Sequence, residues 1–275
     1  MTERYAVFGN PIKHSKSPQI HSAFAENTQQ DLTYEAICVP EGEFAEHVDS
    51  FLSGDGRGLN ITIPFKQEAW NLADIRSPRA EMAGAVNTLY RNDQGQLCGD
   101  NTDGIGMVRD IVSNHGGTIE GKRVLILGAG GAVRGVLQPV LEQSPAKLVI
   151  ANRTASKAVE LADLVADLGD VTGCGYDTLG EECFDLVING TAASLQGEVP
   201  PLPDNTLAEN AWCYDMMYSA EPTAFCLWAE KMGAEKAIDG LGMLVEQAAQ
   251  SFLIWRGVEP DSQAVIRQIR NSLTA

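Results

Sequence analysis

Three glycines, Gly128, Gly130 and Gly131, lie directly after the apolar run VLIL and before a helical pattern. Glycine lets the backbone turn tightly and approach a pyrophosphate, whose charge is met by free N–H groups at the helix N-terminus. The third glycine of the usual G-x-G-x-x-G pattern would fall at Val133, so the match is imperfect. Because a strand precedes the turn and a second strand ends about 20 residues later, the stretch favours a dinucleotide site over a purely steric turn.

Basic residues follow the second strand, where many dinucleotide-binding chains carry an acid. Arg153 and Lys157 stand one helical turn apart in IANRTASK. An acid would hydrogen-bond the ribose 2′-hydroxyl and repel a phosphate, whereas a guanidinium fork and an ammonium attract a 2′-phosphate. The alternative is a solvated helix start with incidental basic residues. The pattern favours NADP over NAD, and the expected cofactor contacts in this half are Gly128, Ala129, Gly130, Gly131, Ala132, Asn152, Arg153, Thr154 and Lys157.

The elements that position these residues alternate along the chain. Apolar β-rich runs at 4–9, 33–39 and 58–63 are separated by helical patterns at 17–30 and 41–54. This alternation predicts α/β units around a largely parallel sheet. The Ser17 hydroxyl is expected to cap the first helix, with Pro18 at the first helical position.

A second α/β series begins near residue 122 and predicts a Rossmann-like, doubly wound parallel sheet. Its expected strands are 122–128, 147–152, 184–190, 212–217 and 234–240, and its expected helices include 133–143 and 154–169. The glycine-rich stretch 99–117 separates the two series, and the helices after residue 240 are expected to return to the first domain. We therefore predict an α/β chain of two domains, 1–103 completed by 241–275, and 104–240.

Composition excludes several classes of partner. Of 275 residues, 44% are hydrophobic and 21% charged, and 20 basic against 37 acidic side chains give a formal charge of −17. This balance argues against nucleic acid or an anionic membrane surface as a partner. The N-terminus lacks the apolar region of a signal peptide, and no apolar run is long enough to span a bilayer.

Six scattered cysteines form no CxxC or Cys/His cluster. They are expected to be reduced core thiols of a cytoplasmic protein, and no metal site is expected. These cysteines are Cys38, Cys98, Cys174, Cys183, Cys213 and Cys226.

Six polar stretches resemble motifs of the shikimate dehydrogenase family. They occur in matching order, nearly end to end, and are GNPIKHSKSPQIH (9–21), NITIPFK (60–66), GAVNTL (84–89), GDNTDG (99–104), YDMMY (214–218) and DGLGMLVEQA (239–248). The resemblance implies a substrate domain followed by an NADP domain. It also implies reversible reduction of 3-dehydroshikimate to shikimate with NADPH, in the route to aromatic amino acids.

The resemblance implies that Lys66 is the acid/base of this reaction and that Asp103 is its partner. Hydride transfer to a ketone needs a proton donor at the oxygen, and the reverse reaction needs a base at the alcohol. A lysine beside a carboxylate can deliver that proton while its partner fixes its position. The alternatives are a solvated surface lysine and, for Asp103, a helix N-cap.

Further roles also come from the resemblance. Ser15 and Ser17 are implied to bind the substrate carboxylate, and a second group is implied to bind hydroxyls or the carboxylate. That second group consists of Thr62, Asn87, Asp103, Tyr218 and Gln247.

Other positions are less directly involved. Asn60 is expected to help hold the Lys66 loop, and Met216 and Gly240 match family positions near the nicotinamide. His14 and His21 are interpreted as surface or loop histidines. In the stretch 189–195, Ala192 stands where the family often has serine, which puts one minor cofactor contact in doubt.

Three other functions stay open. One is a quinate/shikimate dehydrogenase that uses NAD, which Arg153 and Lys157 disfavour. Another is a non-catalytic ligand-sensing module of the same fold, which could lose the lysine or the aspartate. A third is another amino- or folate-linked dehydrogenase, which would not need NITIPFK and GDNTDG together. The expected partner is a small-molecule substrate, and the chain is expected to be a monomer or a homodimer.

Overall fold

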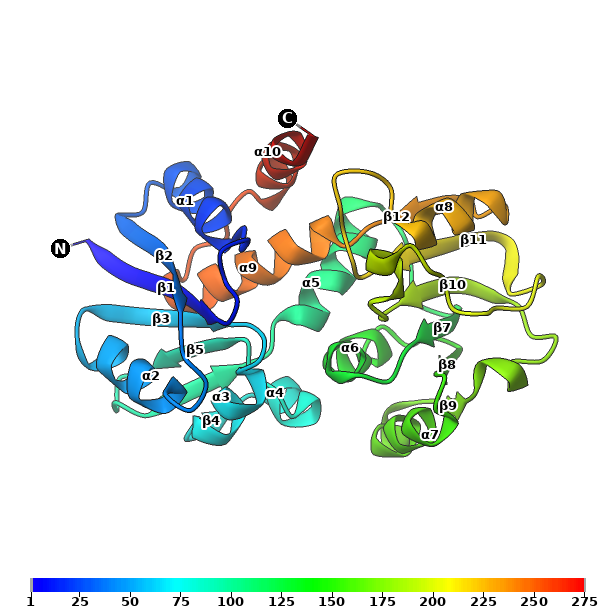
Figure 1. The fold of residues 1–275 in the computed structure, drawn as a ribbon, viewed down its shortest axis with the longest axis horizontal. Coiled ribbons are helices and arrows are strands. Elements are labelled where there is room, and N and C mark those ends of the chain that lie inside the picture. The colour runs from blue at the N-terminus through cyan, green and yellow to red at the C-terminus, as the bar shows by residue number, and fades with distance from the viewer. Residues whose placement is uncertain (1, 275) are drawn as a thin grey trace. The chain divides into compact units, whose positions relative to one another are not determined.

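The computed structural model describes residues 2–274 and divides the chain into two compact units. The first unit is Met1–Gly106 with Leu244–Ser272, and the second is Met107–Met243 with Leu273–Ala275. Each unit is built on one six-stranded sheet flanked by helices (Figure 1). Among the described residues, no helix combines the length and the apolar composition that a bilayer crossing needs.

The sheet of the first unit is parallel in three of its five strand pairings and antiparallel in two. Its order is β2-β1-β3-β5-β6-β4; β3 pairs antiparallel with β5, and β5 antiparallel with β6, while the other pairs are parallel. The strands are β1 (Glu3–Gly9), β2 (Leu32–Cys38), β3 (Gly56–Ile61), β4 (Ile75–Arg76), β5 (Thr88–Arg91) and β6 (Leu97–Asp100). The β5–β6 hairpin was not predicted. Its turn is stabilised by Asn92, whose side chain accepts the N–H groups of Gln94 and Gln96, and by Gly95 at φ 78°.

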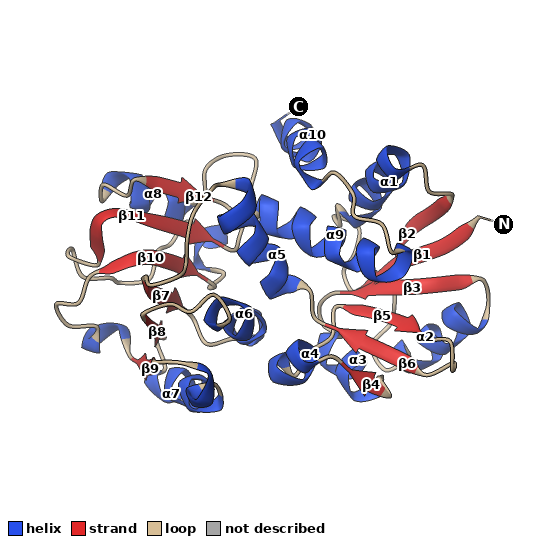
Figure 2. Cartoon of the chain, turned by 180° about the vertical axis from the view of Figure 1, so that it is seen from behind, coloured by secondary structure: helices blue, strands red, loops and turns tan. Residues whose placement is uncertain are grey.

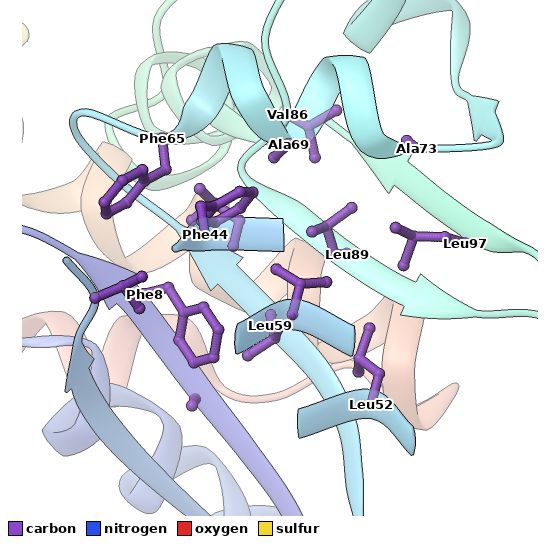
Figure 3. Packing of buried hydrophobic residues seen from close by; sticks show 14 of the residues in the cluster. Phe8, Phe44, Leu52, Leu59, Phe65, Ala69, Ala73, Val86, Leu89 and Leu97 are labelled. Carbon is purple, nitrogen blue, oxygen red and sulfur yellow. The ribbon is translucent and has the colours of Figure 1, made fainter. Parts of the chain in front are cut away.

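One face of this sheet packs on an apolar core. Because side chains alternate along a strand, Leu59 and Ile61 point to this core while Asn60 points to the opposite face. Figure 3 shows the core side chains, among which the rings of Phe44 and Phe65 stack at 5.0 Å. The helices of this unit before the second sheet are α1 (Ser17–Thr28), α2 (Phe44–Ser53), α3 (Lys66–Leu72) and α4 (Pro78–Ala83).

The opposite face is covered by α1 and by α9 (Leu241–Arg256), and α10 (Ser262–Thr274) is joined to α9 by the hydrogen bond from Ser262 to Glu246. In Figures 1 and 2, α1 and α9 lie on the other side of the sheet from α2 and α3. Aromatic stacking joins these elements: Tyr5 stacks on Trp255 at 4.9 Å and His21 on Tyr34 at 4.2 Å. The interpretation of His21 as a surface or loop histidine is therefore wrong, since α1 turns it onto the sheet with 1% exposure.

The predicted cap of α1 is also wrong. The helix begins at Ser17, so Lys16 occupies the N-cap position and makes no side-chain cap hydrogen bond. The Ser17 N–H donates to Ser15 Oγ at 3.3 Å. The serine hydroxyl that accepts an N–H at the helix start is therefore that of Ser15 and not that of Ser17.

The second unit contains a fully parallel sheet in the order β12-β11-β10-β7-β8-β9. Renumbered within the unit, this is the doubly wound order 6-5-4-1-2-3. The strands are β7 (Arg123–Leu127), β8 (Lys147–Ala151), β9 (Val171–Cys174), β10 (Phe184–Asn189), β11 (Leu207–Asp215) and β12 (Lys236–Ile238). The sequence predicted all of these except β9, whose four residues carry little apolar signal.

Helices cover both sheets and connect their strands. Those of the second half are α5 (Asp103–Arg109), the π-helix η1 (Asp110–Asn114), α6 (Gly131–Leu141), α7 (Ala155–Leu164), the 3₁₀ turns η2 (Ala166–Leu168), η3 (Tyr176–Thr178) and η4 (Ala193–Gln196), and α8 (Ala224–Lys231). The core of the second sheet includes Leu125, Val149, Phe184 and Val187 and is closed by Phe225 of α8. In doubly wound folds the ends of strands such as β7 and β10 face the ligand. Here both strands are anchored by this apolar core.

Candidate active site

In the first unit, Lys66 and Asp103 form an ion pair. Lys66 Nζ lies 2.5 Å from Asp103 Oδ2, and the two side chains are 30% and 16% exposed. Lys66 is the first residue of α3, and its backbone carbonyl accepts the N–H of Val86. The preceding residue, Phe65, is fully buried in the apolar core, so it anchors the loop that carries the lysine.

Asp103 is held from both sides. It is the first residue of α5, where a carboxylate interacts favourably with the helix dipole, and its N–H donates to Asn101 Oδ1 at 3.1 Å. Its second carboxylate oxygen, Oδ1, accepts a hydrogen bond of 2.8 Å from Asn87 Nδ2. One oxygen therefore faces an ammonium and the other an amide donor, a geometry that fixes the carboxylate for directed proton chemistry.

Two further predicted residues complete this group. Asn87 Nδ2 also lies 2.9 Å from Thr102 Oγ1 and 3.3 Å from Gln247 Oε1, which brings α9 to the group. Gln247 Nε2 donates to the Leu244 carbonyl at 2.7 Å. Thus Lys66, Asp103, Asn87 and Gln247, which are far apart in sequence, converge on one cluster of ionic and amide groups.

Two other predicted substrate residues of the first unit, Ser15 and Thr62, make local contacts. Thr62 follows β3, and a Cβ added at Gly9 would lie 2.5 Å from its methyl carbon. Ser15 precedes α1, and its N–H donates to the Ile12 carbonyl. Within residues 2–274, no hydrogen bond joins Ser15 or Thr62 to the Lys66–Asp103 pair. Tyr218 belongs to the second unit, where burial raises the pKa of its hydroxyl.

In the second unit, the glycine turn has the backbone that a phosphate site requires. Gly128 has φ 105°, a left-handed conformation that favours glycine, and it packs against Gly190 and Thr191 at the end of β10. Helix α6 begins at Gly131, and its N-cap is Gly130. Because glycine has no side chain, the N-cap residue offers no side-chain acceptor to the first N–H groups of this eleven-residue helix.

A hollow of about 180 Å³ joins this turn to the basic residues after β8. It is lined by Ala129, Gly130, Asn152, Arg153, Thr154 and Lys157. Asn152 Nδ2 donates to the Thr154 carbonyl, so the segment turns tightly before α7 begins. Two cationic side chains thus share one hollow with the glycine turn, which suits the phosphate and ribose end of a dinucleotide.

Met216 and Gly240 lie together near the ends of β11 and β12. A Cβ at Gly240 would overlap the backbone of Met216, and Met216 Sδ lies 3.2 Å from the position of a Cβ at Gly190. The Met216 N–H donates to the Asn189 carbonyl at 2.9 Å. This close packing extends from the glycine turn to the two residues predicted to lie near the nicotinamide.

Sequence reasoning missed several buried polar residues that support these sites. In the second unit, Asp215 accepts hydrogen bonds from Asn189 and Thr223, and burial raises the pKa of its carboxyl. Ser194, two residues after Ala192, accepts from Asn189 Nδ2 at 2.9 Å. The signal available in the sequence was the position of Asn189 and Asp215 at strand ends. In the first unit the missed residues are Thr88, Thr102 and Ser251.

The fold and the site define the class of this protein. It is an α/β protein of two units, one of which has a doubly wound, Rossmann-like sheet. Three family models match the chain: "Shikimate dehydrogenase substrate binding domain" at residues 7–89, "Shikimate / quinate 5-dehydrogenase" at 110–196, and "Shikimate 5'-dehydrogenase C-terminal domain" at 240–270. The chain belongs to the shikimate dehydrogenase family.

Individual relatives cover the chain almost completely. The "Shikimate dehydrogenase (NADP(+))" of Alkalilimnicola ehrlichii is 58% identical over 270 residues, which are 98% of this chain and 99% of the relative. That of Cellvibrio japonicus is 59% identical over 273 residues, 99% of each chain. The crystal structure of shikimate 5-dehydrogenase from Thermus thermophilus in complex with NADP(H) and shikimate is 30% identical, with a TM-score of 0.87, and the match covers 98% of this chain and 100% of that one.

Proposed function

We propose that this chain is an NADP-dependent oxidoreductase that interconverts 3-dehydroshikimate and shikimate. The observation that carries the proposal is the ion pair of 2.5 Å between Lys66 and Asp103, completed by Asn87 on the second carboxylate oxygen. Membership of the shikimate dehydrogenase family gives this pair its reaction. The product would serve the route to aromatic amino acids.

Lys66 acts as the acid/base in this proposal. In reduction its ammonium donates a proton to the oxygen of the ketone, and in oxidation the neutral amine accepts the proton of the alcohol. Asp103 holds Nζ in place and stabilises the ammonium form. Because Asn87 and Gln247 adjoin the carboxylate, their amide groups are available to bind ring hydroxyls beside the reacting carbon.

The substrate carboxylate needs donors of its own. We assign it to the Ser15 and Ser17 hydroxyls at the start of α1, with Thr62 and Tyr218 binding a hydroxyl or the carboxylate. Neutral donors suit this task because a chain with a formal charge of −17 must capture an anion by local hydrogen bonds rather than by its overall field. The first unit is accordingly the substrate domain in our proposal.

The second unit is proposed to bind NADP, which supplies the hydride acceptor or donor when bound. The glycine turn and α6 offer N–H groups to the pyrophosphate, while Arg153 and Lys157 offer positive charge to the 2′-phosphate. Met216 offers an apolar contact and Gly240 a close backbone approach to the nicotinamide.

The direct test is a crossed assay of the purified protein. Absorbance at the NADPH band is followed with shikimate or quinate, each with NADP⁺ or NAD⁺. We expect shikimate with NADP⁺ to give the highest kcat/KM by a wide margin. Comparable values for quinate and NAD⁺ would favour a quinate/shikimate dehydrogenase, and no absorbance change in any arm would favour a ligand-binding module.

Two finer assignments complete the proposal. The six cysteines are free, which is usual for proteins of the reducing cytoplasm, and we assign the enzyme to that compartment. We also expect a monomer or a homodimer. Cell fractionation tests the compartment, and light scattering of the purified protein tests the oligomeric state.

A further inference from the structure

Behind the Lys66–Asp103 pair, buried polar side chains form a continuous hydrogen-bond network. They lie on the sheet face that α1 and α9 cover, opposite the apolar core, and each is at most 9% exposed. The members are His21, Tyr34, Asn60, Asn87, Thr88, Thr102 and Ser251.

Asn60, at the centre of the network, has a defined orientation. Its Nδ2 lies 3.1 Å from the backbone carbonyl of Asn87, which can only accept, so this atom must be the amide nitrogen. Its Oδ1 therefore faces the Tyr34 hydroxyl at 2.8 Å and His21 Nε2 at 3.1 Å, and both groups donate to it. Tyr34 and His21 thus donate to Asn60, and Asn60 in turn donates to the Asn87 carbonyl.

Thr88 connects Asn60 to the ion pair in the same donor-to-acceptor order. Its hydroxyl accepts from Asn60 Nδ2 at 3.3 Å and donates to Asn87 Oδ1 at 2.8 Å. Asn87 Oδ1 also accepts the Thr102 N–H at 3.0 Å, so the carbonyl side of this amide is fixed. The amide nitrogen of Asn87 is consequently turned toward Asp103 Oδ1, on which it donates at 2.8 Å.

The other end of the network reaches α1 through His21. Its Nε2 donates to Asn60 Oδ1 at 3.1 Å, and its ring stacks on Tyr34 at 4.2 Å. One buried network therefore connects α1, the helix that begins at Ser17, with the carboxylate that holds Lys66. Asn60 is shared by both branches.

Stability alone is a weak reason for such a network. A buried hydrogen bond contributes little net stability, and replacing both partners by apolar groups of the same shape can be nearly neutral. The opposite face of the same sheet is indeed filled by apolar side chains. Directed hydrogen bonds do offer something that apolar packing does not, namely a fixed orientation for Asn87.

We propose that Tyr34, Asn60 and Thr88 are positioning residues for the reaction proposed above, on which this inference rests. Through Thr88 they hold the Asn87 amide against the Asp103 carboxylate. Through His21, which Asn60 binds and Tyr34 stacks on, they hold α1, the helix that begins at Ser17. Neither Tyr34, Asn60 nor Thr88 needs to touch the substrate for this role. The network sets the spacing between the carboxylate site and the acid/base pair.

The main test is Thr88→Val, which removes the hydroxyl and keeps the shape. We expect kcat for shikimate oxidation to fall about tenfold, since one aligning hydrogen bond is lost, while KM for NADP⁺ stays within about twofold. Thr88→Ser keeps the hydroxyl and should restore most of kcat.

A second variant, Tyr34→Phe, tests the other branch. It removes one of the two donors that fix Asn60 Oδ1, while His21 still donates. We expect KM for shikimate to rise about three- to tenfold, with kcat within about twofold, because α1 is held less firmly. The control matched to Thr88→Val is Thr206→Val in the second unit. It removes a similarly buried hydroxyl, which donates to the Pro203 carbonyl.

The outcomes separate the two proposals. A wild-type protein without shikimate turnover contradicts the proposed function. An active wild type whose Thr88→Val variant keeps normal kcat contradicts the positioning role alone. Equal losses in Thr88→Val and Thr206→Val that follow the melting temperature would likewise reduce the network to a structural element, and so would unchanged kinetics in Tyr34→Phe.

Discussion

Acid should destabilise the folded protein through His21, and His21→Phe should relieve this effect. The ring is buried, and its burial lowers its pKa from the ordinary 6.5 to about 3, against the smaller opposing effect of the Asn60 hydrogen bond. In the unfolded chain a histidine titrates near its ordinary value. Unfolding therefore takes up a proton between these two pH values, and the free energy of unfolding falls as pH decreases from about 6.5 to about 3.

The size of the effect follows from the two pKa values. Each pKa unit of difference corresponds to about 1.4 kcal/mol. At about pH 4.5, roughly two units below the unfolded pKa, the free energy of unfolding is therefore lower by about 2.7 kcal/mol. At about pH 7.5 the histidine is neutral in both states, and its titration changes the free energy of unfolding by almost nothing. A loss of this size is a substantial part of the stability of a typical protein, about 5–15 kcal/mol.

Phenylalanine is a suitable replacement because it retains the aromatic stack on Tyr34, whose hydroxyl remains a donor for Asn60 Oδ1. Urea unfolding of wild type and His21→Phe is measured at about pH 7.5 and pH 4.5. Both proteins share every other titrating group, so their difference isolates this one. The difference in unfolding free energy should shift by roughly 2–3 kcal/mol in favour of the variant at the lower pH.

His14→Phe is the matched control, because His14 lies in an exposed turn before α1. It should keep the pH dependence of the wild type. If His21→Phe and wild type differ by the same amount at both pH values, then His21 binds its proton equally well folded and unfolded. Burial of a neutral ring against Asn60 and Tyr34 would then be the wrong account of this position.

Three further predictions concern the sites. Arg153→Ala should raise KM for NADP⁺ about ten- to a hundredfold and leave KM for NAD⁺ nearly unchanged, because one charge-assisted contact is lost. Steady-state kinetics with both cofactors measure this, and equal losses with the two cofactors would contradict the 2′-phosphate assignment. Lys66→Met should lower kcat about 10²–10⁴-fold with little change in the shikimate dissociation constant, and a variant that keeps kcat while losing affinity would make Lys66 a binding residue. Asp103→Asn should lower kcat and also weaken shikimate binding, as measured by kinetics and calorimetry; normal turnover in this variant would contradict the orienting role.

Local patterns made much of the second unit predictable. The run VLIL, the glycines from 128 to 131 and the basic residues after the next strand are all read within one βαβ segment. Each feature depends on neighbours in sequence, so its geometry follows from short-range rules on turns, helix starts and strand ends. The structure accordingly has the parallel doubly wound order and places Arg153 and Lys157 in one hollow with Gly130.

The first unit was less predictable, because its polar residues are placed by contacts between distant segments. Asn60 Nδ2 meets Ser251 Oγ at 3.0 Å across 191 positions, and Asn60 Oδ1 meets His21 Nε2 at 3.1 Å across 39 positions. Helical periodicity alone does not tell which face of α1 meets the sheet, so His21 was interpreted as exposed. The role of Lys66 beside Asp103 likewise came from a family resemblance and not from their spacing.

The imperfect glycine motif illustrates how such a distant contact can satisfy a local rule. The third glycine of the motif normally permits close packing of helix and strand, and here Val133 occupies that position and is fully buried. The space comes instead from Gly190 at the end of β10, where an added Cβ would overlap the Val133 side chain. Gly190 also borders Gly128 and Met216, so it contacts both the glycine turn and the residue predicted to lie near the nicotinamide. The close approach of helix and strand that the motif requires therefore depends on residues at the ends of β7 and of β10, at the switch point of the sheet. A motif that covers only the residues after β7 does not include Gly190 and so underestimates this site.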